Sequence, residues 1–483
     1  MPYVAQFEKA GKPSVLILFE DQDDCLKNGA RLLGVPNVRR VYCSRTGDGS
    51  EDAARIMEPL MDALVRPLTA KEKEGGRWEV PDRRVLFEGT LDEAEEFYER
   101  AEKVPVLGNA YMSLYTDGMA IRIPTEERVQ AMLKGTSHKP DEVITLQSDH
   151  TRREMGVGGK KGSPVRFEPL KCTATVEKVA INALMAGCRP EYMPVLLAIA
   201  EAGGGGGDGR GSLGFCVSGP IAKEIGMNFD VGMLGPRNQA NRSIGRAAEL
   251  MWCNLGGNIP KVTSCGIMGN PLFNCFPENA DALPPGWKGV NEEYGFRRDE
   301  SVIYVLAMKG GPPGSFTFRS TEFGPGGYRS FQKSGGGGVI AKRLGKEGIP
   351  GPHNWLEYEI PSFWASKEGG FNFIILPEMA QHLYESGFKS KDEIYKWLYQ
   401  ASFIPYKEYK LRTSPGWHAG TYHPTEKTSG KPWDELPDDY MVPLVDDPYE
   451  NCIIVTGGGE ETSHWVNGRT PNADPVYNID KWR

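Results

Sequence analysis

Residues 173–202 constrain the fold most strongly, because they predict two apolar helices joined by a short turn. Apolar residues recur at helical spacing in both halves of the segment, as Val179 and Ala183 do in the first half. Gly187 is typical of a helix C-terminus, and Pro190 is typical of the first turn of the next helix. We therefore expect a helical hairpin in the core of the protein.

The turn of this hairpin carries side chains that a plain core rarely places there. Cys188 and Arg189 lie in the turn, and Glu191 and Tyr192 follow it. Because a helix N-terminus favours anions and lowers a thiol pKa, we predict Cys188 as a catalytic nucleophile with Glu191 as a second catalytic residue. Arg189 and Tyr192 are predicted to bind an anionic substrate. The alternatives are a buried structural thiol and a structural ion pair of Arg189.

A second candidate site lies in residues 237–257, which predict another helix with a polar start. Arg242 and Arg246 are four residues apart and share one helical face. Two like charges on one face repel each other unless an anion or acidic groups lie opposite. We therefore predict that these arginines bind the substrate together with Asn238 and Asn241, and the alternative is a subunit interface.

Glu278 stands in a Pro-Glu-Asn turn, where a carboxylate can serve as a general base. We predict it as a catalytic residue, and the alternative is an exposed loop acid.

Histidine is scarce in this chain, which contains seven. His150 follows Asp149, and His464 comes shortly after Glu460 and Glu461. Imidazole and carboxylate together suit a divalent transition metal. We predict His150 and His464 as metal ligands. They are far apart in the sequence, so they can bind one metal ion only if the fold brings them together.

The composition excludes several classes of protein. A net charge of −8 without a basic block disfavours nucleic-acid binding. No stretch of about 18 apolar residues occurs, and the first residues contain no signal-peptide core, so we expect a cytoplasmic protein that does not enter a membrane. Nine cysteines with no C-x-x-C argue against a disulfide framework and a thioredoxin-like motif.

A chain of 483 residues is too long for one core, and the pattern predicts an α/β fold with a small N-terminal parallel-sheet domain and a larger α/β domain. The small domain spans 1–105, and Thr90 with Glu93 forms a capping box at its last helix. Its predicted strands are 14–20, 38–44 and 83–90, and its predicted helices are 23–34, 53–65 and 90–104.

Residues 106–170 are predicted to form an extended arm that contains one helix, 124–135. The main domain, 171–483, is expected to carry the site on a helical core with glycine-rich loops. Residues 405–439 look like an insertion within it. Its predicted elements are a helical part at 173–260, strands at 301–308, 371–376 and 452–457, helices at 377–387 and 391–401, and glycine loops at 203–207 and 335–338.

Several stretches together resemble one family. They are TVEKVAINALMAGCRPEYMPVLLA, residues 219–257, GNPLFNCFPENADALPPGW, PTEERVQAMLKGT, MDALVRPLTAKE and IIVTGGGEETSHW. In this combination they are similar to bacterial proteins of the UGSC group, which is named for a selenocysteine- or cysteine-Gly-Ser-Cys motif. The resemblance implies thiol- or selenol-dependent reduction. The chain departs from the pattern, because its nearest strings are Cys43-Ser44 and Cys265-Gly266 and neither supplies the second thiol.

These observations lead us to expect a soluble bacterial enzyme that acts on a small anionic organic substrate, with a thiol-dependent reductase implied by the resemblance. The missing dithiol favours the alternative of a metal-assisted lyase or hydrolase. A non-catalytic subunit of a larger complex is the rival class, in which the glycine-rich loops and the paired arginines are contact surfaces. The expected partners are a small-molecule substrate and a second copy of the chain, or else a different subunit.

Overall fold

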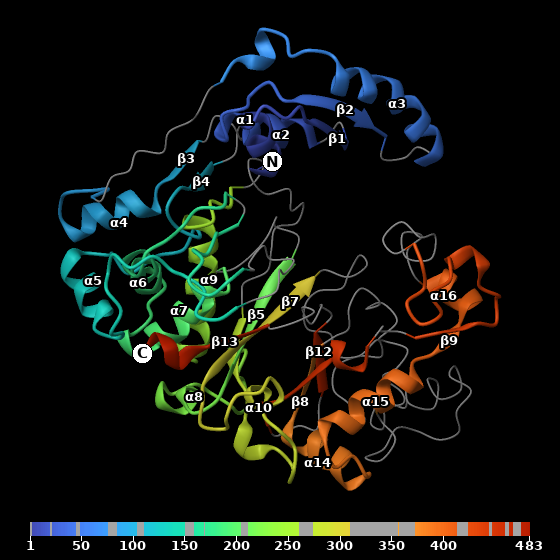
Figure 1. Cartoon of the computed structure of the whole chain (residues 1–483). Helices are drawn as coiled ribbons and strands as arrows, with labels where there is room; N and C mark the ends of the chain where they lie inside the picture. The colour runs from blue at the N-terminus through green and yellow to red at the C-terminus, as the bar shows by residue number, and fades with distance from the viewer. Residues whose placement is uncertain are drawn as a thin grey trace.

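The chain folds into helices and mixed sheets that include parallel strands, and the predicted α/β class is confirmed (Figure 1). No described helix is both long and apolar enough to cross a bilayer. The computed structural model describes residues 2–19, 22–44, 49–75, 85–103, 111–149, 159–168, 170–203, 211–259, 274–309, 356, 372–412, 424–443, 447–458, 463–466 and 475–483.

The N-terminal elements form a group that lies at the top of Figure 1. Two strands pair in parallel there, as predicted, and three helices accompany them. The predicted third strand at 83–90 is wrong for its described part, since residues 85–90 form no strand and the apolar Val85 and Leu86 stay exposed. The elements are α1 (Pro2–Lys9), β1 (Val15–Phe19), α2 (Asp23–Leu32), β2 (Arg39–Cys43), α3 (Gly49–Val65) and η2 (Lys71–Lys73).

The helix predicted after this group is confirmed together with its capping box. The Thr90 hydroxyl accepts a hydrogen bond from the Glu93 backbone at 3.3 Å, and the Glu93 carboxylate accepts from the Thr90 backbone at 2.8 Å. A short antiparallel pair connects this helix to the rest of the chain. The elements are α4 (Leu91–Glu99), β3 (Ala101–Lys103), β4 (Tyr111–Ser113) and α5 (Glu126–Leu133).

The predicted helical hairpin is confirmed and forms the centre of the largest hydrophobic core. Gly187 ends the first helix with a φ of +84°, and Pro190 opens a 3-10 turn that leads into the second helix. Every residue of that second helix is buried, which explains why all of them except Glu201 are apolar. The elements are α6 (Val176–Met185), η4 (Pro190–Tyr192), α7 (Met193–Glu201) and α9 (Gln239–Asn254).

A four-stranded sheet with the order β13-β7-β5-β6 lies beside these helices (Figure 1). The prediction of a wholly helical part at 173–260 is wrong, because β5 runs through its middle. The strand's glycines and serines hide its apolar pattern, yet residues 214–218 are all buried. The strands are β5 (Gly211–Ser218), β6 (Asn274–Pro277), β7 (Val302–Lys309) and β13 (Val476–Asn478), with α8 (Ile221–Glu224), η5 (Ala280–Ala282), α10 (Val290–Glu293) and η9 (Ile479–Trp482) around them.

A second sheet has three strands in the order β11-β8-β12, and it contains two of the predicted strands. Both predicted helices beside it are confirmed, and Ser390 caps the second by accepting from the Glu393 backbone at 3.3 Å. The elements are β8 (Asn372–Ile375), α14 (Pro377–Glu385), α15 (Lys391–Ala401), η8 (Pro448–Glu450), β11 (Cys452–Val455) and β12 (Ser463–Val466).

The segment predicted as an insertion has a small hydrophobic cluster of its own, in which Tyr409 stacks on Trp433. Residues 413–423 within it lie outside the described residues, as do both predicted glycine loops apart from Gly203. The insertion and the domain boundaries stay predictions. The elements are β9 (Ile404–Pro405), α16 (Tyr406–Arg412), η7 (Trp433–Glu435) and β10 (Met441–Val442).

Candidate functional site

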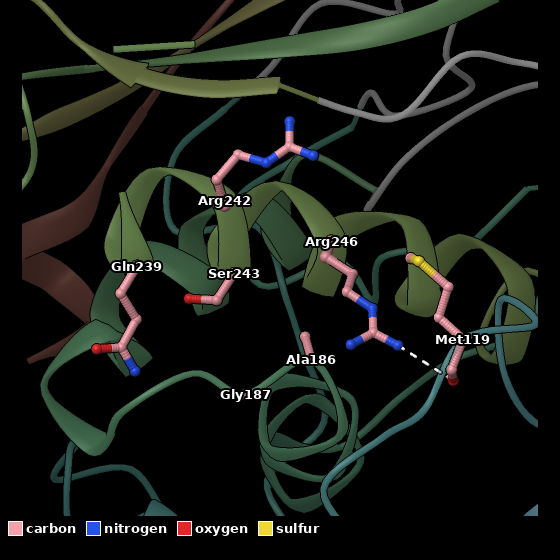
Figure 2. Close-up of a pocket in the computed structure, with 7 residues that line it drawn as sticks. All are labelled: Met119, Ala186, Gly187, Gln239, Arg242, Ser243 and Arg246. Atoms are coloured by element: carbon pink, nitrogen blue, oxygen red, sulfur yellow. Dashed lines mark hydrogen bonds between the residues drawn. The ribbon is translucent and has the colours of Figure 1, made fainter. Parts of the chain in front are cut away.

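A pocket of about 270 Å³ lies between α9 and the turn that follows α6. It brings together parts of two predicted sites, since the turn leads to Cys188 and α9 carries the paired arginines. Its lining residues are Met119, Ala186, Gly187, Gln239, Arg242, Ser243 and Arg246 (Figure 2).

Arg246 is the most firmly held polar group of the pocket. Its Nε and Nη2 atoms donate to the two carboxylate oxygens of Asp117 at 2.7 and 2.9 Å, and Nη2 also reaches the carbonyls of Met119 and Ala120. The hydrogen bond with Asp117 raises the pKa of Arg246 against the opposing effect of burial. Nη1 makes no hydrogen bond to any described residue, and the guanidinium points from α9 toward Ala186 (Figure 2).

Arg242 borders the same pocket but is held differently. Its side chain is exposed and extends from the other side of α9 in Figure 2. Within the described part of the chain, no carboxylate lies within 4.0 Å of its guanidinium, whereas Arg246 has Asp117 opposite. The expected acidic counter-group therefore exists for one of the two predicted arginines, and the charge of the other is available to a ligand.

Ser243 adds a buried hydroxyl to the pocket. Its side chain is 7% exposed, and its Oγ atom makes no well-formed hydrogen bond, which is unusual for a buried polar atom. A weak contact joins it to the Cys188 thiol. Gly187 faces open space, since no atom lies within 4 Å of the position that a Cβ would take there.

Cys188 is fully buried, and burial raises the pKa of its thiol to about 12, with Ser243 and Arg246 opposing the rise. The predicted lowering of this pKa is therefore wrong. The Cys188 backbone donates to the Ala183 carbonyl at 3.0 Å, so the residue closes the end of α6. It lies before the 3-10 turn η4, and the N-terminus of α7 begins only at Met193.

The other predicted residues of the hairpin turn lie outside the lining of the pocket. Arg189 and Glu191 form an exposed ion pair at 3.8 Å, which is the structural alternative for Arg189. Tyr192 is 2% exposed, and burial raises its pKa. Their predicted roles in catalysis and substrate binding stay predictions without support from the pocket.

Asn238 and Asn241 hold the loop that precedes α9. The Asn238 amide donates to the carbonyls of Gly232 and Gly235, at 2.5 and 3.4 Å. The buried Asn241 amide accepts from the Asn228 backbone and donates to the Asn228 carbonyl, both at about 3 Å. These bonds hold both side chains against the loop, so the structure gives them a positioning role.

Glu278 is buried, and the alternative of an exposed loop acid is wrong. Its carboxylate accepts from the Ser218 hydroxyl at 2.6 Å and from the Val290 backbone at 2.7 Å. Lys391 donates to it at 3.3 Å and to Glu293 at 3.1 Å. Glu278 therefore belongs to a satisfied ionic network between β6 and α15, and it does not line the pocket.

The predicted metal ligands are not brought together in the described structure. His150 lies outside the described residues, and His464 stands in β12 with Ile374 as its Cα partner. The described residues contain no group of three or more His, Cys, Asp or Glu that could hold a metal ion. The divalent transition metal stays a prediction.

Sequence reasoning missed Asp117 and Glu249. Glu249 has one carboxylate oxygen, Oε2, that is buried and accepts no hydrogen bond from any residue that the structure describes. Burial and the nearby Asp117 raise its pKa to about 7, and Arg246 opposes the rise. The helical spacing of Arg242, Arg246 and Glu249 was a usable signal. No sequence signal points to Asp117, since it is 129 residues away from Arg246 in the chain.

Comparisons with known proteins leave the chain without an assigned relative. No family model matches it, and no curated protein and no solved structure shows significant similarity to it. The resemblance to the UGSC group therefore stays a prediction that rests on the sequence motifs alone.

Proposed function

We propose that this protein binds a small organic carboxylate in the pocket between α6 and α9 and acts on it as an enzyme. The observation that carries the proposal is the Arg246 guanidinium, which Asp117 holds by two hydrogen bonds while Nη1 stays available. A guanidinium fixed in this way recognises a carboxylate with little further loss of side-chain entropy.

The charges around the pocket favour an anion over a cation. Asp117 and Arg246 neutralise each other, and Arg242, which has no carboxylate within 4.0 Å among the described residues, leaves a net positive charge. The N-terminal turn of α9, which begins at Gln239, adds the positive end of a 16-residue helix. The buried Ser243 hydroxyl, whose one contact among the described residues is the weak one with the Cys188 thiol, adds a polar group to the pocket.

The size and the apolar part of the pocket limit the ligand further. A volume of about 270 Å³ lies just below the range of roughly 300–1,000 Å³ that is usual for drug-sized ligands. Met119 and Ala186 provide apolar surface beside the polar groups. A carboxylate on a short carbon skeleton suits this combination.

Thiol chemistry at Cys188 is not part of the proposal. The residue is 0% exposed, and at neutral pH a thiol with a pKa of about 12 is almost wholly protonated. Because the thiolate is the nucleophile, the structure gives the reductase implied by the resemblance no support at this residue.

The test compares the binding of benzoate with that of benzamide by isothermal titration calorimetry at pH 6. We expect benzoate to bind and benzamide, which lacks the charge, to bind at least tenfold more weakly. Arg246→Gln should weaken benzoate binding by about tenfold or more, and Arg242→Gln by several-fold.

The matched control is Arg297→Gln, which removes an exposed arginine that is paired with Asp299. It should leave the affinity for benzoate unchanged. Equal binding of benzoate and benzamide, or equal losses in all three variants, would refute the proposed carboxylate site. Melting temperatures of the variants separate lost binding from lost folding, and Arg246→Lys retains the charge if Arg246→Gln folds poorly.

A further inference from the structure

We infer that Glu249, a neighbour of the pocket residue Arg246 on α9, is a proton-binding group, so that the protein takes up a proton when it binds its anionic ligand. This inference rests on the proposed function, because it assigns a regulation to the carboxylate site described above.

The geometry places Glu249 beside the cation that the ligand would use. It lies three residues after Arg246, so the two side chains leave α9 from neighbouring positions about one helical turn apart. Its Oε2 atom is buried without a partner, whereas both oxygens of Asp117 are bound to Arg246. Two carboxylates therefore share the neighbourhood of one guanidinium, and only one of them is neutralised by it.

Burial has the largest effect on the Glu249 carboxyl and raises its pKa, the charge of Asp117 raises the pKa further, and the charge of Arg246 lowers it. The nearby Cys253 thiol is also affected by Glu249. Burial raises the pKa of this thiol to about 12, and the charges of Glu249 and Asp117 contribute to the rise. The described ionisable residues on the elements around Glu249 are Arg242, Arg246 and Cys253 on α9, Tyr115, Asp117 and Arg122 before α5, Glu177 and Lys178 on α6, Cys188 after α6, Glu201 on α7 and Cys275 on β6.

The charge of Glu249 determines how the binding of an anion depends on pH. Below a pH of about 7 the Glu249 carboxyl is mostly protonated, and Asp117 and Arg246 form a neutral pair. Above that pH the ionised Glu249 adds a second negative charge beside Arg246, which opposes the binding of an anion. By linkage, a bound anion raises the pKa of Glu249 further, so that binding takes up a proton.

The experiment measures benzoate binding by isothermal titration calorimetry at pH 6, 7.5 and 9, a range in which benzoate stays ionised. For the wild-type protein we expect the affinity to fall by about three- to thirty-fold between pH 6 and pH 9, as a coupling of about half to one and a half pKa units requires. Glu249→Gln, which has nearly the same shape, should bind equally well at all three pH values. Titrations in two buffers of different ionisation enthalpy should show proton uptake at pH 7.5 that the variant lacks.

The control is Glu96→Gln, which removes one negative charge from an exposed position on α4. It should retain the pH dependence of the wild-type protein. Tight binding at pH 6 without pH dependence, or a pH dependence that Glu249→Gln retains, would overturn the role of Glu249 and leave the carboxylate site standing. Absence of binding by wild-type protein at pH 6 would overturn both. If Glu249→Gln fails to fold, the proton uptake of the wild-type protein decides between these outcomes.

Discussion

Lys391 is the residue whose surroundings depend most on the whole fold. It is 2% exposed, and its ammonium lies 3.3 Å from Glu278 and 3.1 Å from Glu293. Burial opposes its charge, but the two carboxylates outweigh burial and raise its pKa. Burial also raises the pKa of Glu293, with Lys391 opposing that rise. Burying any one of these charges alone would be costly, and in the network each charge lies beside an opposite one. The network therefore links α15 to Glu278 after β6 and to Glu293 on α10.

Lys391→Met should therefore destabilise the protein by about 3–5 kcal/mol at pH 8, because it leaves the buried Glu278 and the partly buried Glu293 without their cation. The loss should be smaller at pH 5, since Glu293 already has a raised pKa and can take up a proton there. Urea unfolding at both pH values measures this. The control is Lys396→Met on the same helix, which breaks an exposed pair with Asp392 and should leave the free energy of unfolding nearly unchanged. Similar small losses in both variants would show that the network is not stabilising.

At the scale of elements, helices were predicted well and strands less well. Helical periodicity, caps and glycine ends are local signals, and α5, α6, α7, α14 and α15 all appear where these signals placed them. β5 was missed because its burial comes from β6 and β7 on either side and not from its own composition. Residues 85–90 had an apolar pattern but do not pair with another strand in the described structure.

The contact between α5 and the hairpin turn gives an element-scale prediction. A Cβ on Gly135, just after α5, would overlap the backbone carbonyl of Pro190 in η4. Gly135→Ala should therefore destabilise the protein by about 1–3 kcal/mol, as other forced overpacking does. Thermal unfolding measures the change. Gly75→Ala is the control, because no atom lies within 4 Å of its Cβ position. An unchanged melting temperature for Gly135→Ala would mean that α5 and η4 can separate freely.

At the scale of the whole molecule, one buried carboxylate ties distant segments together. Glu201 on α7 accepts hydrogen bonds from the Gln147 backbone and from the Trp482 indole, both at 2.7 Å. Burial raises its pKa from 4.5 to about 7, although both hydrogen bonds oppose the rise. Glu249 has a pKa raised to about 7 as well. The folded protein therefore binds protons that the unfolded chain releases.

The free energy of unfolding should fall as the pH rises from 5.5 to 8.5. A group with a raised pKa in the folded state contributes stability below its unfolded value of 4.5, and that stability is lost as the pH rises through about 7. Together the two carboxyls predict a loss of about 2–4 kcal/mol over this range. Urea titrations at pH 5.5, 7 and 8.5 measure it. A constant or rising stability would contradict the protonated state of these two buried groups.

The sequence by itself determined the fold class, the helical hairpin and the helix α9 that carries the arginines, because each of these depends on residues within a few turns of one another. Only the tertiary structure decided which polar groups meet. In the folded protein Arg246 pairs with Asp117, and Cys188 is buried. Glu278 is buried as well and pairs with Lys391. Desolvation and charge pairing set the chemistry of these groups, and both depend on segments that are more than a hundred residues apart in the chain.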